Sequence, residues 1–153
     1  MFSKEEASQI RKKFWTSLGQ FMKLQSSASG ETVNWINYKT GIKGLQVKMD
    51  VDNKSARIAI EMTQNDREIQ ELMFEQFEEF QLLFESKMED DWIWFRSYFD
   101  GSGKEISKIE LRLEDVNIFK EEDWPEIIRF LKNNLLKLDE FWEDVKDAFE
   151  IFK

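Results

Sequence analysis

The sequence of 153 residues contains no cysteine and no histidine. Without these residues the chain can form no disulfide, no thiolate nucleophile, no imidazole base and no ordinary Cys/His zinc site. Any catalysis would therefore rest on Asp, Glu, Lys, Tyr or Ser. One proline and six glycines leave little room for a linker, so the chain is expected to form a single domain over residues 1–153.

Long apolar runs are also missing. The first residues, MFSKEEASQIRKKFW, have no apolar core of a signal peptide, and no run approaches the roughly 18 apolar residues that a membrane span needs. We therefore expect a cytoplasmic protein that makes no contact with a membrane.

Charge is distributed unevenly along the chain, whose formal net charge is −9. Residues 1–61 carry 10 basic and 6 acidic side chains, which gives +4, whereas residues 62–153 carry 12 basic and 25 acidic side chains, which gives −13. An acidic protein is a poor partner for nucleic acid, because non-specific binding depends on cations that neutralise phosphates. If the protein binds an anion, we expect the anion on residues 1–61.

Helical signals occur at three places. Ser3 and Glu6 have the form of a capping box before apolar residues at helical spacing, which predicts a helix from residue 3 to about 23. The segment TQNDREIQ begins a second apolar stripe, which predicts one long helix to about residue 87.

The third helical signal lies near the carboxyl end. Asp123 can cap a helix that has Pro125 in its first turn, with Glu126 completing a capping box. Asn133 and Asn134 are weak helix formers, so a kink near them would divide this segment into a helix pair.

Strand signals fall into two groups. From Val33 the apolar period is two, in VNWINYK, LQVKMDV and SARIAIEM, which predicts a three-stranded antiparallel meander. The segments DDWIWFRSYF and SKIELRLE flank the turn DGSGKE and predict a second β-hairpin. The fold class is therefore α+β, with an N-terminal helix, the meander, a long helix, the hairpin and a C-terminal helix or kinked helix pair around a mixed or antiparallel sheet.

The pairing register of the central strands follows from their apolar residues. If a tight turn places Val51 opposite Ala56, then Met49 pairs with Ile58, and the remaining pairs up to Leu45 with Met62 are also apolar. One face of this pair is then buried and the other is polar.

The aromatic residues of the hairpin allow two interpretations. Trp92, Trp94 and Tyr98 alternate on one side of their predicted strand, where they could stack on bases. Packing of this row against helices is the interpretation we favour.

The stretch DVDNKSARIAIE, residues 50–61, has the acidic spacing of a calcium-binding loop. Its fifth position is Lys54 and its sixth is Ser55, where such a loop needs glycine, and no helices flank it. We expect neither a bound metal nor another cofactor.

A nuclease arrangement is a second interpretation of the same residues. The order of elements resembles that of restriction-endonuclease-like nucleases, which place an Asp on the second core strand and Glu-x-Lys on the third. Asp50 and Glu61 would supply the acids, but Thr63 stands in place of the lysine. In the register above the acids lie about 13 Å apart along the strands, too far for one Mg²⁺ with ligand distances of about 2.1 Å. No catalytic residue is therefore assigned.

The segments KKFWTSLGQFMK, VNWINYKTGIKGL, QELMFEQFEEF, WIWFRSYFDGSGKEISKI and VNIFKEEDWPEIIRFLKNNLLKLDEFW resemble the bacterial domain of unknown function numbered 4268. The similarity covers nearly the entire chain. The resemblance implies an endonuclease-like fold without an assigned reaction, in a domain that also occurs at the carboxyl end of larger proteins.

The polar face of the meander is the candidate binding surface. With Lys39 opposite Leu45, the first predicted strand would bring its polar residues beside those of the next two strands. The candidate residues are Asn34, Tyr38, Lys48, Asp50, Arg57 and Glu61. They could recognise a peptide, a nucleotide or an anion, or they could form a solvated face with an exposed ion pair worth roughly 0.2 to 1 kcal/mol.

These observations favour a non-catalytic interaction or regulatory module on a degenerate nuclease-like scaffold. The alternative is a metal-dependent nuclease or another nucleic-acid-processing enzyme. A protein partner or a second copy of the chain is a possible ligand, because the acidic and aromatic segment DEFWEDVKDAFEIFK could dock either.

Overall fold

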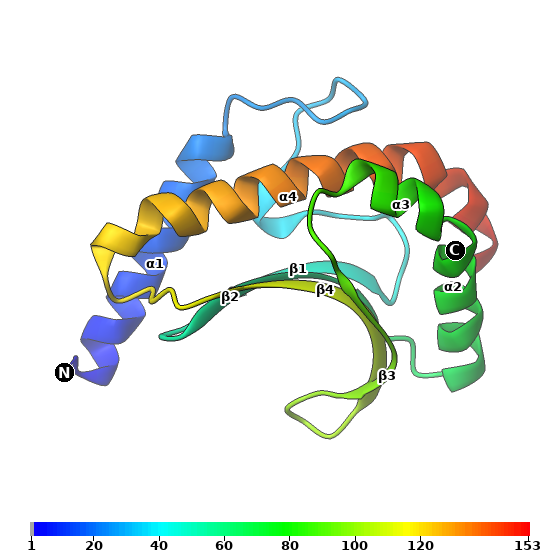
Figure 1. Cartoon of the computed structure of the whole chain (residues 1–153), viewed down its shortest axis with the longest axis horizontal. Helices are drawn as coiled ribbons and strands as arrows, with labels where there is room; N and C mark the ends of the chain where they lie inside the picture. The colour runs from blue at the N-terminus through cyan, green and yellow to red at the C-terminus, as the bar shows by residue number, and fades with distance from the viewer. Residues whose placement is uncertain (1) are drawn as a thin grey trace.

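A computed structural model describes residues 2–153 and shows an α+β fold. The helices are α1 (Lys4–Met22), α2 (Arg67–Glu79), α3 (Gln81–Lys87) and α4 (Trp124–Val145), and the strands are β1 (Leu45–Val51), β2 (Ser55–Met62), β3 (Ile93–Phe99) and β4 (Glu105–Glu114). The chain forms helix α1 and the hairpin β1–β2, then helices α2 and α3 and the hairpin β3–β4, and last helix α4 (Figure 1). Three 3₁₀ helices complete the order: η1 (Trp35–Asn37), η2 (Glu121–Asp123) and η3 (Lys146–Phe152).

The four strands form one antiparallel sheet in the order β1-β2-β4-β3. Two hairpins therefore meet through β2 and β4 at the centre, and β1 and β3 are the edges. The sheet arches strongly, with the helices over its convex side, while the β3–β4 hairpin curls underneath (Figure 1). The opposite, concave face carries no helix among residues 2–153.

The predicted register of the central hairpin is confirmed. Val51 pairs with Ala56, Met49 with Ile58, and Leu45 with Met62. The apolar residues of β2 reach the interior completely, since Ile58 is 0% exposed. The turn between the strands is closed by Asp52, whose carboxylate accepts hydrogen bonds from the backbone N–H groups of Lys54 and Ser55 at 2.8 Å each.

The core lies between the convex face of the sheet and the helices. α4 packs on β2, and α2 packs on both β2 and β4. Aromatic rings fill the space where α2, α3 and the chain end meet, and burial of each such side chain contributes roughly 1.5 to 3 kcal/mol. Fully buried rings there include Phe77, Phe84, Phe141 and Phe149, while Phe14 of α1 packs against Trp124 at the start of α4.

The N-terminal helix begins as predicted. Ser3 accepts a hydrogen bond from the backbone N–H of Glu6, and the Glu6 carboxylate accepts one from the backbone N–H of Ser3, at 3.1 Å each. This capping box satisfies two donors that would otherwise lack partners. No helix of the part of the chain that the structure describes is long and apolar enough to cross a membrane.

The prediction of a first strand for the meander is wrong. VNWINYK contains the 3₁₀ helix η1, where the Asn34 side chain accepts a hydrogen bond from the backbone N–H of Asn37. Trp35 is 3% exposed and donates its indole N–H to the backbone carbonyl of Gln25. Side-chain capping and burial of Trp35 therefore replace the strand that the period of two predicted.

The second predicted helix is divided in two. α2 ends at Glu79, and Phe80 has φ −101° and ψ 13°, outside the helical region, before α3 begins at Gln81. The Phe80 N–H bonds to the Phe77 carbonyl, so the chain tightens at the break. Phe77 and Phe84 lie on either side of the break and both reach the aromatic core, as their spacing of seven residues predicts.

The predicted cap of the last helix is wrong. The Asp123 side chain caps nothing in α4; its carboxylate accepts the backbone N–H of Asn117 instead, at 2.9 Å. α4 continues through Asn133 and Asn134, so the single C-terminal helix, one of the two predicted alternatives, is confirmed; the Asn134 side chain donates to the Phe130 carbonyl one turn earlier. The helical geometry changes only after Val145, where η3 begins.

Candidate functional site

Three of the six predicted site residues meet on the concave face of the sheet. Arg57 of β2 donates to the Asp50 carboxylate from Nε at 2.9 Å and from Nη2 at 2.5 Å. Its Nη1 donates to Glu61 Oε2 at 2.9 Å. Ala59 lies between Arg57 and Glu61 on the same face, and its methyl group leaves room for the guanidinium.

Strand β4 supplies charged residues that the sequence analysis did not assign to the site. Arg57 Nη1 also donates to Glu110 Oε2 at 3.0 Å. Glu110 in turn accepts from Lys108 Nζ at 2.6 Å and from Arg112 Nε at 2.8 Å. We call Asp50, Arg57, Glu61, Lys108, Glu110 and Arg112 the concave charge network.

A pattern in the sequence could have revealed this half of the network. Lys108, Glu110 and Arg112 alternate with Ile109 and Leu111 along SKIELRLE. Because side chains alternate across a strand, the three charges must share one face. The alternation does not show which strand lies beside β4. In the structure β4 pairs with β2, which places Lys108 opposite Glu61 and Arg112 opposite Arg57.

Half of this network is buried although no helix covers it. The side chains of Lys108, Glu110 and Glu61 are 3%, 5% and 9% exposed, whereas Asp50 is 62% exposed. The expectation of a solvated face is therefore wrong for Glu61 and right for Asp50. Charges buried to this degree are stable only when they are paired and hydrogen-bonded, as they are in this network.

Two aromatic rings cover Lys108. Its ammonium lies 3.5 Å from the ring centroid of Tyr98 and 5.2 Å from that of Phe95. Tyr98 reaches this face because β3 has a register shift between Phe95 and Tyr98, a β-bulge that reverses the alternation. The predicted row of Trp92, Trp94 and Tyr98 on one side is therefore wrong for Tyr98. Trp92 and Trp94 pack in the helix layer, as favoured, with edge contacts to Phe84.

The network shifts the protonation equilibria of its members. Burial opposes the charge on Arg57, but hydrogen bonds and attraction from Glu61 and Asp50 outweigh it and raise the pKa of Arg57. Burial would raise the pKa of Glu110, but the hydrogen bond from Lys108 and the nearby positive charges hold this pKa below its usual value. Arg57 and Glu110 are therefore charged at neutral pH.

A small pocket on the concave face adjoins the network. Its volume is about 330 Å³, and it lies between the network and the β3–β4 turn. Residues that line it include Arg57, Glu61, Tyr98, Asp100, Lys108 and Arg112.

The remaining predicted residues lie elsewhere. Lys48 is exposed on β1 and forms no ion pair within residues 2–153. Asn34 caps η1, and the Tyr38 hydroxyl donates to the Asp139 carboxylate of α4 at 2.6 Å. Burial and the hydrogen bond to Asp139 raise the pKa of Tyr38. Neither Asn34 nor Tyr38 joins the concave charge network.

The structure brings two carboxylates together without leaving a place for a metal between them. Glu61 and Glu110 approach the same nitrogen of Arg57, at 2.9 and 3.0 Å. In the described part of the chain, no group of three or more acidic side chains could hold a metal ion. A cation is already present where the carboxylates converge, and it is the guanidinium.

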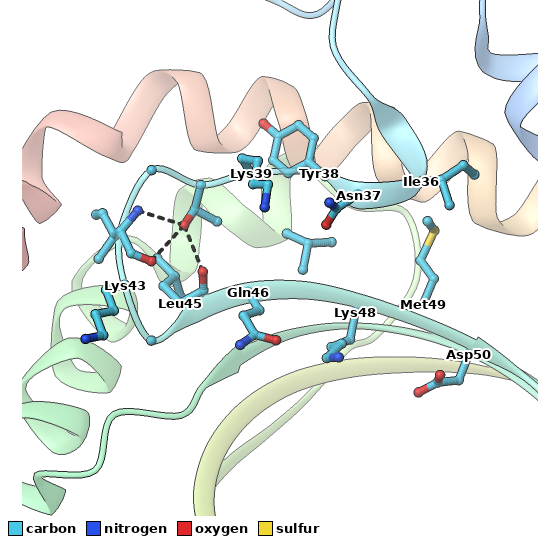
Figure 2. A pocket seen from close by; sticks show the side chains of 15 residues that line it. Ile36, Asn37, Tyr38, Lys39, Lys43, Leu45, Gln46, Lys48, Met49 and Asp50 are labelled. Atoms are coloured by element: carbon cyan, nitrogen blue, oxygen red, sulfur yellow. Dashed lines mark hydrogen bonds between the residues drawn. The ribbon is translucent and has the colours of Figure 1, made fainter.

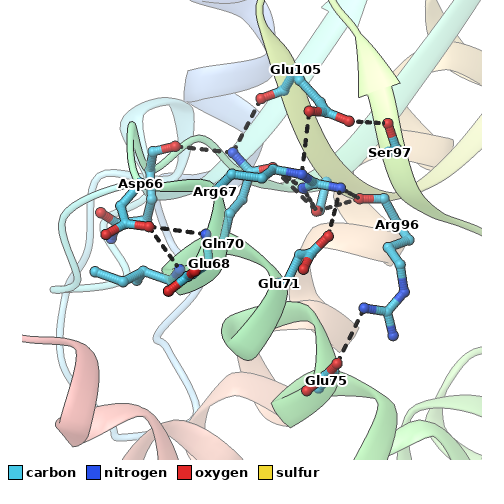
Figure 3. Close-up of polar contacts among 12 residues, drawn as sticks. Asp66, Arg67, Glu68, Gln70, Glu71, Glu75, Arg96, Ser97 and Glu105 are labelled. Atoms are coloured by element: carbon cyan, nitrogen blue, oxygen red, sulfur yellow. Dashed lines mark hydrogen bonds and ion pairs between the residues drawn. The ribbon is translucent and has the colours of Figure 1, made fainter.

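A second polar cluster joins α2 to the hairpin β3–β4 (Figure 3). Arg67 donates to the Arg96 carbonyl at 2.9 Å and to the Ser107 hydroxyl at 3.0 Å. Gln70, 1% exposed, donates to the carbonyls of Gln64 and Glu105. These bonds satisfy backbone groups near the bulge, so the cluster positions β3 rather than forming an open site.

The fold and the concave charge network define an α+β domain with helices on one face of a curved antiparallel sheet. The family described as Domain of unknown function (DUF4268) matches residues 10–146, and the chain belongs to this family. The match carries no assignment to the restriction-endonuclease-like nucleases. No curated protein and no solved structure matched the chain.

Proposed function

We propose that this domain is a non-catalytic module that acts by binding a protein partner, on a scaffold where a nuclease-like arrangement of acids has no free metal site. The observation that carries the proposal is the position of Arg57 Nη1 between Glu61 and Glu110. A metal-dependent enzyme needs open carboxylate oxygens and a place for a bound water.

The remaining chemistry of the chain supports the same proposal. Without cysteine and histidine, the candidate acids and bases are mainly carboxylates and lysines. On the concave face, Lys108, Arg112 and Arg57 hold the pKa of Glu110 below its usual value, so that this carboxylate stays ionised. Groups fixed in one protonation state serve poorly as general acids or bases. The cytoplasmic location expected from the sequence stays a prediction.

A metal-dependent nuclease is the second candidate, and one observation favours it. Two carboxylates and Lys108 do meet on a concave surface, which is part of what metal-assisted phosphodiester cleavage requires. Movement of Arg57 out of the network would have to accompany metal binding. The net charge of −9 opposes the approach of a nucleic acid substrate.

A metal titration separates the two candidates. We expect the melting temperature to stay unchanged when MgCl₂ or MnCl₂ is raised to about 10 mM, beyond the change given by NaCl of equal ionic strength. A supercoiled plasmid incubated under the same conditions should remain intact. A saturable rise in melting temperature that disappears in Glu110→Gln, together with plasmid cleavage, would contradict the proposal.

A further inference from the structure

The outer edge of β1 carries backbone groups that no other strand uses. The Thr63 N–H bonds to the Gly44 carbonyl, and the Asp52 N–H bonds to the Ser55 carbonyl. Since hydrogen-bonded positions alternate in an antiparallel pair, the even-numbered residues of β1 face β2. The N–H and C=O groups of Val47 and Met49 therefore point away from the sheet.

The chain itself closes only one end of this edge. The Leu45 carbonyl accepts from the Thr40 hydroxyl at 2.8 Å, and the Leu45 N–H donates to the Ile42 carbonyl at 3.2 Å. Within residues 2–153, no group outside the β1–β2 pair bonds to the backbone of Val47 or Met49.

A groove of about 610 Å³ runs along this open edge, between β1 and residues 36–44 (Figure 2). In Figure 2 the side chains of Ile36 and Met49 lie on the helix side of β1, and those of Gln46 and Lys48 point to the other side. An added strand would therefore meet apolar contacts on one face and polar contacts on the other. The groove occupies the place of the predicted first strand, which η1 and the Tyr38–Asp139 hydrogen bond hold away from the sheet.

The rim of the groove is basic although the chain as a whole is acidic. Lys39, Lys43 and Lys48 are exposed, and none forms an ion pair in the described part of the chain. The one carboxylate of the lining, Asp50, is already paired with Arg57. Three free cations beside open backbone donors and acceptors match an extended, negatively charged segment.

A second copy of the chain is a poorer occupant. Antiparallel pairing of two β1 edges through Val47 and Met49 would place Lys48 of one copy opposite Lys48 of the other, and like charges directly opposite each other are unfavourable. A segment rich in Asp and Glu reverses the sign of that interaction.

We propose that the β1 groove binds an extended acidic segment of another protein by strand addition. The backbone of Val47 and Met49 supplies the hydrogen bonds, Ile36 and Met49 supply apolar contacts, and the three lysines select negative charge. This inference rests on the proposed function, because it names the class of partner for the same binding module.

The probe is a fluorescein-labelled peptide of alternating glutamate and valine, blocked at both ends and matched in length to the seven residues of β1. We expect saturable binding in fluorescence anisotropy. A peptide with lysine in place of glutamate, and a glutamate peptide N-methylated at alternate residues, should each bind at least about tenfold more weakly. The first control tests charge and the second tests backbone pairing.

Charge-reversal variants of the protein provide the matched comparison. Lys39→Glu/Lys43→Glu/Lys48→Glu should weaken binding of the glutamate peptide by at least about tenfold. The control set is Lys4→Glu/Lys12→Glu/Lys23→Glu, which changes the net charge equally at exposed lysines outside the groove. This control should bind like the natural sequence, and thermal melts would verify that both variants fold.

An edge variant tests the site independently of charge. Val47→Pro removes an outward N–H, which an edge strand tolerates because β2 does not use that group. It should abolish peptide binding while the protein remains folded. Equal binding of the two charged peptides, or unchanged binding by Val47→Pro, would overturn the inference.

The remaining outcomes separate this inference from the proposed function. Self-association in sedimentation that Val47→Pro abolishes, without peptide binding, would overturn the inference in favour of a second copy. Metal-dependent cleavage with intact peptide binding would overturn the non-catalytic proposal alone. If the peptide does not bind and metal has no effect, the inference about the β1 groove is overturned and the non-catalytic proposal stands.

Discussion

Ile109 and Lys108 are neighbours in β4 and point to opposite faces of the sheet, yet their exposed fractions are 0% and 2%. Ile109 faces the helices, where apolar side chains exclude water. Lys108 faces the concave side, where neighbouring charged and aromatic side chains of the same sheet cover it. A curved sheet thus buries residues on both faces, although helices cover only one.

The two faces differ in what their burial contributes. On the helix side, removal of apolar surface from water stabilises the fold directly. On the concave side, desolvation of the ions opposes folding, and ion pairs and hydrogen bonds offset that cost. The concave face therefore depends on complete pairing, whereas the helix face depends on volume.

The largest expected effect is removal of the carboxylate at the centre of the network. Glu110→Ala leaves Lys108 buried without its 2.6 Å partner and removes contacts of Arg57 and Arg112. We expect a loss of about 3 to 5 kcal/mol in the free energy of unfolding, measured by urea denaturation.

Asp50→Ala is the matched control for that variant. It also removes a carboxylate that contacts Arg57, but Asp50 is 62% exposed, so the expected loss is under about 1 kcal/mol. Equal losses for the two variants would mean that burial does not distinguish the members of the network.

A cavity-forming substitution tests the side of the sheet that packs against the helices. Ile58→Ala should cost about 2 to 5 kcal/mol, because Ile58 is 0% exposed and the removed atoms leave an unfilled space. Ile93→Ala, at a residue that is 60% exposed on β3, should cost under about 1 kcal/mol in the same denaturation experiment. A costly Ile93 variant would show that the edge strand is more tightly packed than its exposure indicates.

The smallest expected effect is a change in pH dependence. Since the folded-state pKa of Glu110 is lower than the ordinary value of 4.5, its charge stabilises the fold above about pH 4.5, and this contribution is lost as the pH falls through the folded pKa. The difference in unfolding free energy between the natural protein and Glu110→Gln should therefore shrink below pH 4.5. A constant difference between pH 7 and pH 3 would contradict a lowered pKa.

Much of the fold could be predicted because local signals agreed with one another. The capping box at Ser3 and the four apolar pairs between β1 and β2 each satisfied two conditions at once. The prediction of a strand at residues 33–39 failed because so short an alternation does not exclude a 3₁₀ turn, which here buries Trp35 and exposes Ile36 and Asn37. Nothing in that alternation shows that Asn34 would cap a turn.

The site was predictable only within one hairpin. The pair Asp50–Arg57 followed from the β1–β2 register, but Glu110 and Lys108 required the pairing of β2 with β4, whose sequences are separated by helices α2 and α3. The placement of Tyr38 depended on Asp139, 101 residues away. Such long-range contacts leave no periodic signal in either segment.

The bulge in β3 determines on which face of the sheet Tyr98 lies. Tyr98 covers Lys108 because of the register shift after Phe95, and Arg67 holds the bulge through the Arg96 carbonyl. Phe95 and Tyr98 are three residues apart, so strict alternation would turn the phenol toward the helices, and the extra residue of the bulge keeps it on the concave face. The closer of the two rings over Lys108 is therefore placed by the spacing of the backbone at this point, and not by any charge of the network.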